Sequence, residues 1–451
     1  MTTGRSPDQV DRAVRRVAAR RPELGQAAEN MADRLTAGEG SSMIHQASVQ
    51  QALWWYLPRN CPEGQWREYL DATAELLTEL GIERLARIAS SEQTAAVLAA
   101  WAEDEDRGAA AFKKAEHDSG VDPPDTPLLA WGSFMGVEEA RALDEVERAL
   151  GEALGLSTLA PGSAGWRRRA AAITAQVLSA SSELVPGQSR LSLITTERVS
   201  MWIDLASPPL REWRKAVGNR LLNPIEPPAD PAAAIAPMAW LLDLAAGEGA
   251  ELTQSGYLPR LAVVDAGARF GWWDWPKPPR SEADVFQIQS LRAAATRLHL
   301  VRRRGRRLRL TSRGSELRRD PAELWRVVAT ESEDSEGFTR MITELVGLRL
   351  LGGRIYVATL AADVAPVLRQ QGWSSAGGLV TAQEVKRAAW RPLRWWRMFG
   401  LLDEEDGWDS ETHRRLAPDT IALTPAGEAT VLAYLRARAT GPRKDFYGSE
   451  R

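Results

Sequence analysis

Between residues 284 and 314 the apolar positions first recur at helical spacing and then alternate as they do in a strand. The first part predicts a helix that ends near Leu300 and buries one face. That face consists of Val285, Ile288, Leu291, Ala295 and Leu298. A hairpin and a strand from Leu308 to Thr311 follow, and the strand leads into another helix. Helix, two-stranded hairpin and helix therefore succeed one another in this short stretch.

The first half of the chain, residues 1–230, shows only helical spacing. Apolar residues recur three and four apart in segments that Gly, Pro and Ser clusters separate, such as 65–80, 93–102, 137–154 and 166–181. We therefore predict an all-helical region, with an internal boundary at the proline-rich loop 120–127. Its tryptophans, Trp54 and Trp55 among them, are expected mostly in the core.

From residue 231 the pattern repeats. Each copy reads as an apolar helix, a short strand, two further helices, a hairpin and a closing helix. Matching positions are Leu252 with Tyr356, Leu300 with Leu401, and Leu310 with Leu423. Repetition of this length predicts two similar modules, module 1 at 231–330 and module 2 at 331–451, the latter with a short disordered tail. The predicted fold class is mainly α, with a helical N-terminal region and two modules that carry short β-hairpins.

The phrase Leu-Thr-x-x-Gly occurs three times in these modules, with its threonine at Thr253, Thr311 and Thr424. Each threonine is predicted to stand between a strand and a helix. A hydroxyl at that position accepts a hydrogen bond from a free N–H group of the first helical turn. We expect these threonines to cap helices and assign them no chemistry.

Composition adds limits to this picture. At 451 residues the chain is too long for one hydrophobic core. Its net charge of −3 means that a nucleic-acid surface has to be a local patch. The single cysteine, Cys61, excludes an intrachain disulfide. The chain has no apolar run of bilayer length and no signal-peptide core, so we expect a cytoplasmic protein without a membrane partner.

The hairpin of module 1 is dense in arginine. Gly305, which can take the positive φ of a tight turn, is surrounded by Arg302, Arg303, Arg304, Arg306, Arg307 and Arg309. Like charges this close repel one another unless they are solvated or neutralised by a polyanion, for which phosphate is the usual partner. A solvated hairpin without a ligand fits the same pattern.

The exposed side of the preceding helix is predicted to be polar around Ala293. It carries Gln289, Ser290, Thr296 and Arg297, with Arg292 at one margin. Amide and guanidinium groups on a helix can read base edges in the DNA major groove, so all of these except Ser290 are candidate nucleic-acid ligands. The pattern fits an ordinary solvated face equally well.

The matching helix of module 2 runs from Thr381 to Phe399 and is predicted to present Arg387, Arg391 and Arg394 in one stripe. Such a stripe suits phosphate tracking or base reading, although Pro392 is expected to kink or restart the helix. The next hairpin begins with the acidic run 403–406, which would repel phosphate. We therefore expect module 1 to be the better nucleic-acid binder and module 2 to serve a protein contact or homodimer.

This order of helices and hairpin over residues 232–438 resembles the winged helix-turn-helix superfamily. The resemblance implies that the third helix of a module enters the major groove while the hairpin, or wing, contacts the backbone. Members of the superfamily also use such modules for protein contacts. In the N-terminal half, the phrase GVDPPDTPLLAWGSFMG is similar to phrases in bacterial proteins of unknown function and implies no activity.

The loop 271–280 of module 1 carries Trp272, Trp273 and Trp275, followed by three prolines. If exposed, it is an anchor for a protein partner or a stacking platform for unpaired bases. If it folds back, it is a hydrophobic lid, which the rarity of large exposed apolar clusters favours.

Signatures of an enzyme are missing from the sequence. It contains neither a phosphate-binding Gly-x-x-x-x-Gly-Lys loop nor a dinucleotide fingerprint. The histidines, His45, His117, His299 and His413, have no partner at metal-ligand spacing, so we expect no metal and no cofactor. The leading hypothesis is a non-enzymatic regulator that binds duplex DNA. The alternative is a protein-interaction scaffold that uses the tryptophan-rich surfaces.

Overall fold

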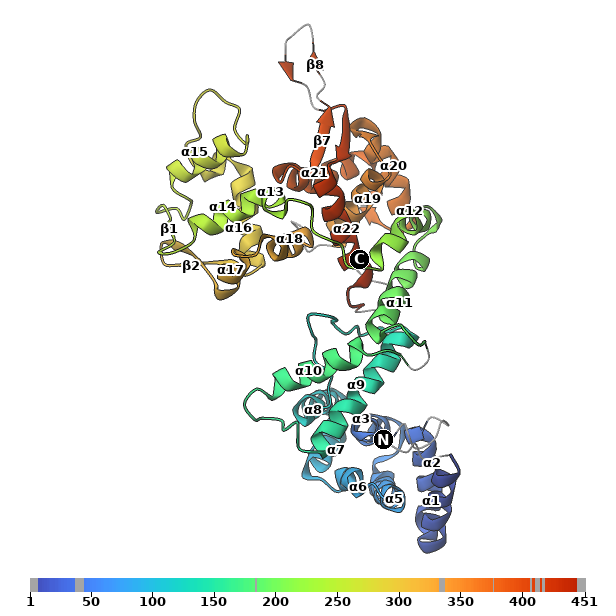
Figure 1. Cartoon of the computed structure of the whole chain (residues 1–451). Coiled ribbons are helices and arrows are strands. Elements are labelled where there is room, and N and C mark those ends of the chain that lie inside the picture. The colour runs from blue at the N-terminus through green and yellow to red at the C-terminus, as the bar shows by residue number, and fades with distance from the viewer. Residues whose placement is uncertain are drawn as a thin grey trace. The chain divides into compact units, whose positions relative to one another are not determined.

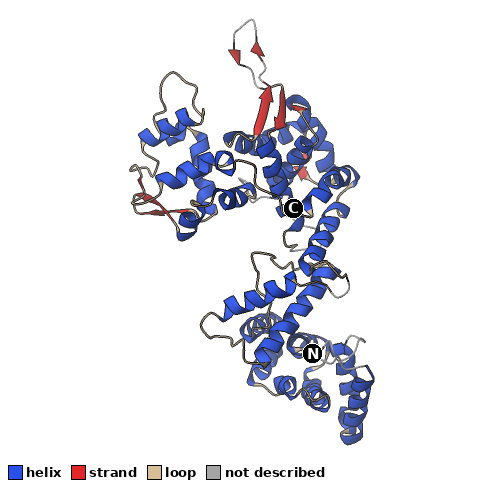
Figure 2. Ribbon diagram, viewed as in Figure 1, coloured by secondary structure: helices blue, strands red, loops and turns tan. Residues whose placement is uncertain are grey.

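The computed structural model describes residues 7–36, 44–182, 185–331, 337–375, 377–405, 408–409, 414–415 and 418–443. These residues are mainly helical, with a few short antiparallel strands (Figure 2), which confirms the predicted mainly α class. The predicted disordered tail falls from residue 444 onward outside the described residues. None of the described helices is long and apolar enough to cross a membrane.

Contacts divide the chain into unit 1, Met1–Ile194, and unit 2, Thr195–Arg451. The division falls inside helix α11 (Arg190–Asp204), whereas the pattern along the chain predicts a boundary at residue 230. The reason lies in packing, since Leu210 and Leu221 are fully buried in the same apolar cluster as the two modules. Contacts also leave modules 1 and 2 in a single unit.

Unit 1 is built from helices, as predicted, and its only described strand pairing is a bridge between Ser181 and Ser189. Trp54 is buried and donates its indole N–H to Thr94, 2.7 Å away, while Trp55 packs edge-on against Trp101. The helices are α1 (Pro7–Arg20), η1 (Pro22–Leu24), α2 (Gly25–Thr36), α3 (Gln46–Gln51), η3 (Ala52–Tyr56), α4 (Leu57–Asn60), η4 (Glu63–Gln65), α5 (Trp66–Glu79), α6 (Glu83–Ala89), α7 (Glu92–Glu103), α8 (Glu105–Ser119), α9 (Val137–Gly155) and α10 (Trp166–Ser179).

Unit 2 opens with the remainder of α11, α12 (Pro208–Gly218) and η5 (Asn219–Leu221). Module 1 then comprises α13 (Pro231–Ala234), α14 (Ala236–Leu244), β1 (Ala250–Glu251), α15 (Arg260–Arg269), η6 (Glu282–Asp284), α16 (Phe286–Arg297), β2 (Val301–Arg304), β3 (Arg307–Leu310), α17 (Ser312–Leu317) and α18 (Pro321–Ala329). Module 2 comprises α19 (Gly337–Leu351), β4 (Ile355–Tyr356), α20 (Val357–Gln370), β5 (Ser374–Ser375), β6 (Gly378–Leu379), α21 (Ala382–Met398), β7 (Leu402–Glu405), β8 (Trp408–Asp409), β9 (Arg414–Arg415), β10 (Thr420–Leu423) and α22 (Pro425–Thr440).

Each module contains a three-stranded antiparallel sheet with the same topology (Figure 1). In module 1 the order is β1-β3-β2, and in module 2 it is β4-β10-β7. In both sheets the strand that precedes the helices pairs with the last strand of the hairpin. The register aligns Ala250 with Leu308 in module 1 and Ile355 with Ile421 in module 2.

The junction between hairpin and closing helix is also built alike in the two modules. Thr311 and Thr424 cap α17 and α22, as predicted, by accepting from the N–H groups of Gly314 and Gly427. A Cβ atom on either glycine would lie 2.0 Å from a carbonyl oxygen of the preceding chain, so only glycine fits. Thr253 differs from the prediction, because its hydroxyl accepts from the Tyr257 N–H and closes a turn.

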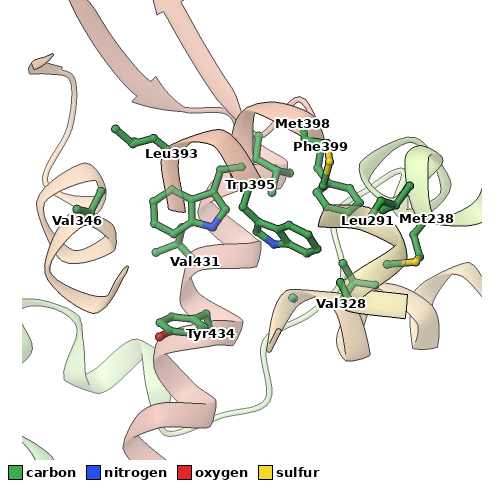
Figure 3. Close-up of a cluster of buried hydrophobic side chains, with 14 of the residues drawn as sticks. Met238, Leu291, Val328, Val346, Leu393, Trp395, Met398, Phe399, Val431 and Tyr434 are labelled. Atoms are coloured by element: carbon green, nitrogen blue, oxygen red, sulfur yellow. The ribbon is translucent and has the colours of Figure 1, made fainter. Parts of the chain in front are cut away.

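One apolar cluster runs through both modules and holds them together. Figure 3 shows Leu291 and Val328 of module 1 close to Trp395 and Phe399 of module 2. Trp325, only 1% exposed, donates its indole N–H across the junction to the Thr430 hydroxyl at 3.0 Å. The two modules therefore share a core, and their surfaces are held in a fixed relation within unit 2.

Candidate nucleic-acid interface

The arginine-rich hairpin of module 1 forms where the sequence predicts it. Strands β2 and β3 pair from Val301 with Leu310 to Arg304 with Arg307, and Gly305 turns the chain at a φ of +60°. Val301 and Leu308 are buried, which fixes the opposite side chains on the solvent side. The hairpin therefore presents a row of guanidinium groups on its outer face.

The arginines of this hairpin differ in their partners. Arg307 lies 3.4 Å from the Glu248 carboxylate, and Arg306 lies 4.0 Å from that of Glu251. Arg303 donates only to the backbone oxygen of Gly305. Within the described part of the chain, no ion pair or side-chain hydrogen bond is formed by Arg302, Arg304 or Arg309. The hairpin thus keeps positive charge that none of the described acidic residues offsets.

Helix α16 has the predicted apolar face but a less open polar face. Ser290, predicted to face solvent, is buried, because α16 packs against neighbours on more than one side. Arg292 forms an ion pair with Glu282 at 2.5 Å and also donates to the Gly256 carbonyl at 3.1 Å. Glu282 is 2% exposed and also accepts from the Leu258 N–H at 2.6 Å. The Arg292 guanidinium therefore ties α16 to the turn before α15.

The other candidates on α16 are also constrained. Gln289 donates to the Glu282 carbonyl at 3.4 Å, and Arg297 pairs with Glu331 at 2.7 Å. Burial raises the pKa of Glu331, and the bond from Arg297 opposes that rise. Thr296 is exposed but donates to the Arg292 carbonyl. The open face of α16 consequently offers little positive charge.

Helix α21 keeps the predicted arginine stripe exposed. It continues unbroken from Ala382 to Met398, so the helix does not end at Pro392, which is buried inside it. Arg387, Arg391 and Arg394 are exposed while Val385 and Leu393 face the core. The stripe is therefore solvent-facing along most of the helix.

An open hollow of about 460 Å³ lies along this stripe and is lined by Arg387, Trp390, Arg391 and Arg394. Trp390 is 46% exposed, and its indole ring is a flat apolar surface between the guanidinium groups. The Arg394 guanidinium also stacks 3.8 Å above the ring centre of Phe286, the first residue of α16. Helices α16 and α21 therefore meet beside the hollow. Trp390 was missed from the sequence, although it stands three residues after Arg387 and four before Arg394.

The acidic run that begins the hairpin of module 2 is largely neutralised. Asp403 pairs with Arg354, and the same guanidinium lies 3.6 Å from Glu405. Glu404 accepts two hydrogen bonds from the Nε–H of Arg397, each at 2.9 Å. Residue 406 lies outside the described residues. The repulsion of phosphate expected from this run is thus offset by neighbouring arginines.

The tryptophans of loop 271–280 in module 1 differ in exposure: two are packed as a lid and one is exposed. Trp272 packs on Phe270 at 4.8 Å, and Trp273 donates its indole N–H to the Lys277 carbonyl, with both rings against the core. These two rings form a lid, as favoured. Trp275, by contrast, is 73% exposed.

No family model, curated protein or solved structure matches this chain. Its function therefore has to be argued from the geometry of its own residues.

Proposed function

We propose that this protein is a non-enzymatic regulator that binds duplex DNA through two winged helix-turn-helix modules. The observation that carries the proposal is the module 1 hairpin, where Arg302, Arg304 and Arg309 have no partner among the described residues. Arg302 and Arg304 are exposed and Arg309 is half-buried. Guanidinium groups without acidic partners gain most from a phosphate backbone, because binding releases the counterions of the DNA. The hairpin acts as a wing that contacts phosphates.

Helix α21 supplies the second contact in this proposal. Its three aligned arginines suit phosphate contacts or a guanine edge, and an α-helix fits the width of the major groove. Module 1 supplies the wing and module 2 the groove-facing helix. This proposal differs from the expectation that module 1 is the better nucleic-acid binder and module 2 serves a protein contact or homodimer.

The test is the salt dependence of duplex binding, followed by fluorescence anisotropy. The triple variant Arg302→Ala, Arg304→Ala, Arg309→Ala should reduce the slope of log K against log salt by about 2–3, since each neutralised phosphate contributes about 0.9. The matched control removes three paired arginines from the same unit, Arg220→Ala, Arg318→Ala and Arg326→Ala. Its slope should stay close to that of the wild type.

Equal slopes for both triple variants would show that net charge, and not the wing, sets the affinity. Absence of duplex binding by the wild type at low salt would overturn the proposal. Tighter binding of single strands than of duplex would instead point to base stacking on Trp390.

A second candidate function is protein interaction, and one specific observation favours it. Trp275 is 73% exposed next to a proline-rich turn, as an interface anchor would be. Capture of proteins from a native lysate should lose defined bands with Trp275→Ala. The control Leu261→Ala removes another highly exposed apolar side chain, 85% exposed, on helix α15, which precedes the loop, and should change nothing. An unchanged set of captured proteins in the Trp275 variant would contradict this function.

A further inference from the structure

Unit 1 brings together three side chains that are far apart in the sequence. His45 is the N-cap of α3, while Asp144 and Glu147 lie one turn apart on α9. One potential ligand atom from each lies within 4.8 Å of the other two. His45 and Glu147 are buried, with 6% and 8% of their surface exposed. Asp144 is 28% exposed in its side chain, so the three side chains converge on one small volume at the edge of the buried region.

The His45 ring is held on both sides. Its Nε2 lies 2.7 Å from Oδ1 of Asp144, and its Nδ1 faces the Ser48 N–H at 3.4 Å. The second contact is longer than usual for a hydrogen bond, so losing it costs little. In the tautomer that carries its proton on Nδ1, at the expense of the contact with Ser48, Nε2 has a lone pair that faces Oδ1 of Asp144. A metal ion would bind this lone pair of the neutral ring, because metal-ligating histidines bind as neutral imidazoles.

Glu147 is the one residue of this cluster whose burial is not explained by a contact with another side chain. Its carboxyl group is directed into this cluster but makes no hydrogen bond or ion pair with any described residue. The side chain is largely removed from solvent, and burial of a carboxyl group carries a desolvation cost. Burial, together with the nearby carboxylates, raises the pKa of Glu147 to about 8.

The surroundings of the cluster are acidic, with one arginine in a supporting position. Glu116 and Asp122 act on Glu147 through their charges. Arg148 donates to Oδ2 of Asp144 at 2.9 Å, which leaves Oδ1 of that carboxylate directed at His45. Such a partner orients a ligating carboxylate in metal sites. The local charge therefore favours a cation, and the hydrogen bonds present suitable ligand atoms.

We propose that His45, Asp144 and Glu147 bind one divalent first-row transition-metal ion. One imidazole nitrogen with two carboxylate oxygens suits Zn²⁺ and its neighbours better than Ca²⁺ or Mg²⁺, which prefer oxygen ligands. The site ties the start of α3 to α9 across 99 residues of sequence. This separation explains why the spacing of the histidines gives no sign of it. The inference is independent of nucleic-acid binding, which is proposed for unit 2.

The experiment uses the full chain, stripped with a chelator and dialysed against Zn²⁺, with bound metal measured by elemental analysis. The wild type should bind one Zn²⁺ per chain and unfold at a higher temperature with the ion than without it. Glu147→Gln, which keeps the shape but removes a ligand charge, should lose this binding at the concentration that saturates the wild type. Arg148→Gln should weaken it by about 10–100-fold, as for an outer partner of a ligand.

Two variants serve as matched controls. Glu152→Gln changes an exposed acid on the same helix, and His117→Gln changes an exposed histidine of unit 1, so both should bind Zn²⁺ like the wild type. Circular dichroism checks that each variant is folded. If Glu147→Gln does not fold, NMR of the wild-type histidine side chains replaces it, with a Zn²⁺-dependent shift of the His45 resonances expected. Zn²⁺ binding that survives Glu147→Gln, absence of bound metal in the wild type, or unshifted His45 resonances would each overturn the proposal.

Discussion

Modules 1 and 2 share a topology but distribute their charge in opposite ways. In module 1 the wing is basic and open, while the arginines of α16 are paired with Glu282 and Glu331. In module 2 the arginine stripe of α21 is exposed to solvent, while the acids of the wing are paired with Arg354 and Arg397. Which surface is available to a polyanion therefore depends on how the charged side chains pair in the fold, and not on their number in the sequence.

The pairs that remove charge also differ in their surroundings. Glu282 is almost fully buried and holds a backbone N–H as well as Arg292, so this pair belongs to the core of module 1. Asp403 is 57% exposed in its side chain, so its pair with Arg354 is a surface contact. Buried pairs are costly to break, whereas surface pairs contribute little. The ion pair on helix α16 of module 1 is thus hard to break, whereas the ion pair on the wing of module 2 is easy to break.

The largest effects are expected where the modules are alike. Gly314→Ala and Gly427→Ala should each reduce the free energy of unfolding by about 3 kcal/mol, because the new Cβ overlaps a backbone oxygen that cannot move freely. Urea denaturation measures the loss. Gly377→Ala, where a Cβ meets nothing within 4 Å, is the control and should be nearly neutral. Clearly unequal losses for the two glycines would show that the junctions are not equivalent.

A smaller loss of stability is expected when the ion pair that holds Arg292 of helix α16 is removed. Glu282→Gln should lower the free energy of unfolding by about 2–3 kcal/mol, because Arg292 loses its charge partner in a partly buried site. The parallel change in module 2, Glu404→Gln, should cost about 1 kcal/mol or less, since that pair is more exposed. Chemical denaturation of both variants gives the comparison directly. Equal losses of free energy of unfolding in the two variants would contradict the distinction between a buried and a surface ion pair.

The smallest change in stability is expected when the ion pairs on the wing of module 2 are removed. The same change should alter the binding of duplex DNA. The double variant Asp403→Asn, Glu404→Gln should lose about 1 kcal/mol or less. It should steepen the salt slope of duplex binding by roughly 1–2, because Arg354 and Arg397 become available to phosphates. The control Asp243→Asn, Glu428→Gln frees Arg318 and Arg220 elsewhere in unit 2. A control slope that rises as much would mean that position on the wing is irrelevant.

Local patterns predict much of unit 2 but not its pairing. The buried face of α16, the turn at Gly305 and the caps at Thr311 and Thr424 follow from spacing and short-range hydrogen bonds, and the structure has them. The burial of Ser290 depends on what packs against α16, which spacing on one helix does not specify. Thr253 has the same sequence context as the capping threonines, but the chain turns back at Gly256 before a helix begins.

The candidate sites show the same limit. The arginine stripe of α21 is predictable because its members lie on one helix, and the structure exposes it. The carboxylates that occupy Arg292 and Arg297 come from η6 and from the residue Glu331 beyond α18. His45 and Asp144 lie 99 residues apart. Such meetings depend on tertiary packing, which single-sequence periodicity does not determine.

Because one apolar core runs through both modules, neither module is expected to behave well as a separate fragment. Expressed alone, module 1 would expose Trp325, now 1% exposed, and module 2 would expose Trp395, now 5% exposed. Freshly exposed indole rings at a cut edge favour aggregation. Each half would be a poor reagent, and heating the intact protein should melt both modules in one step.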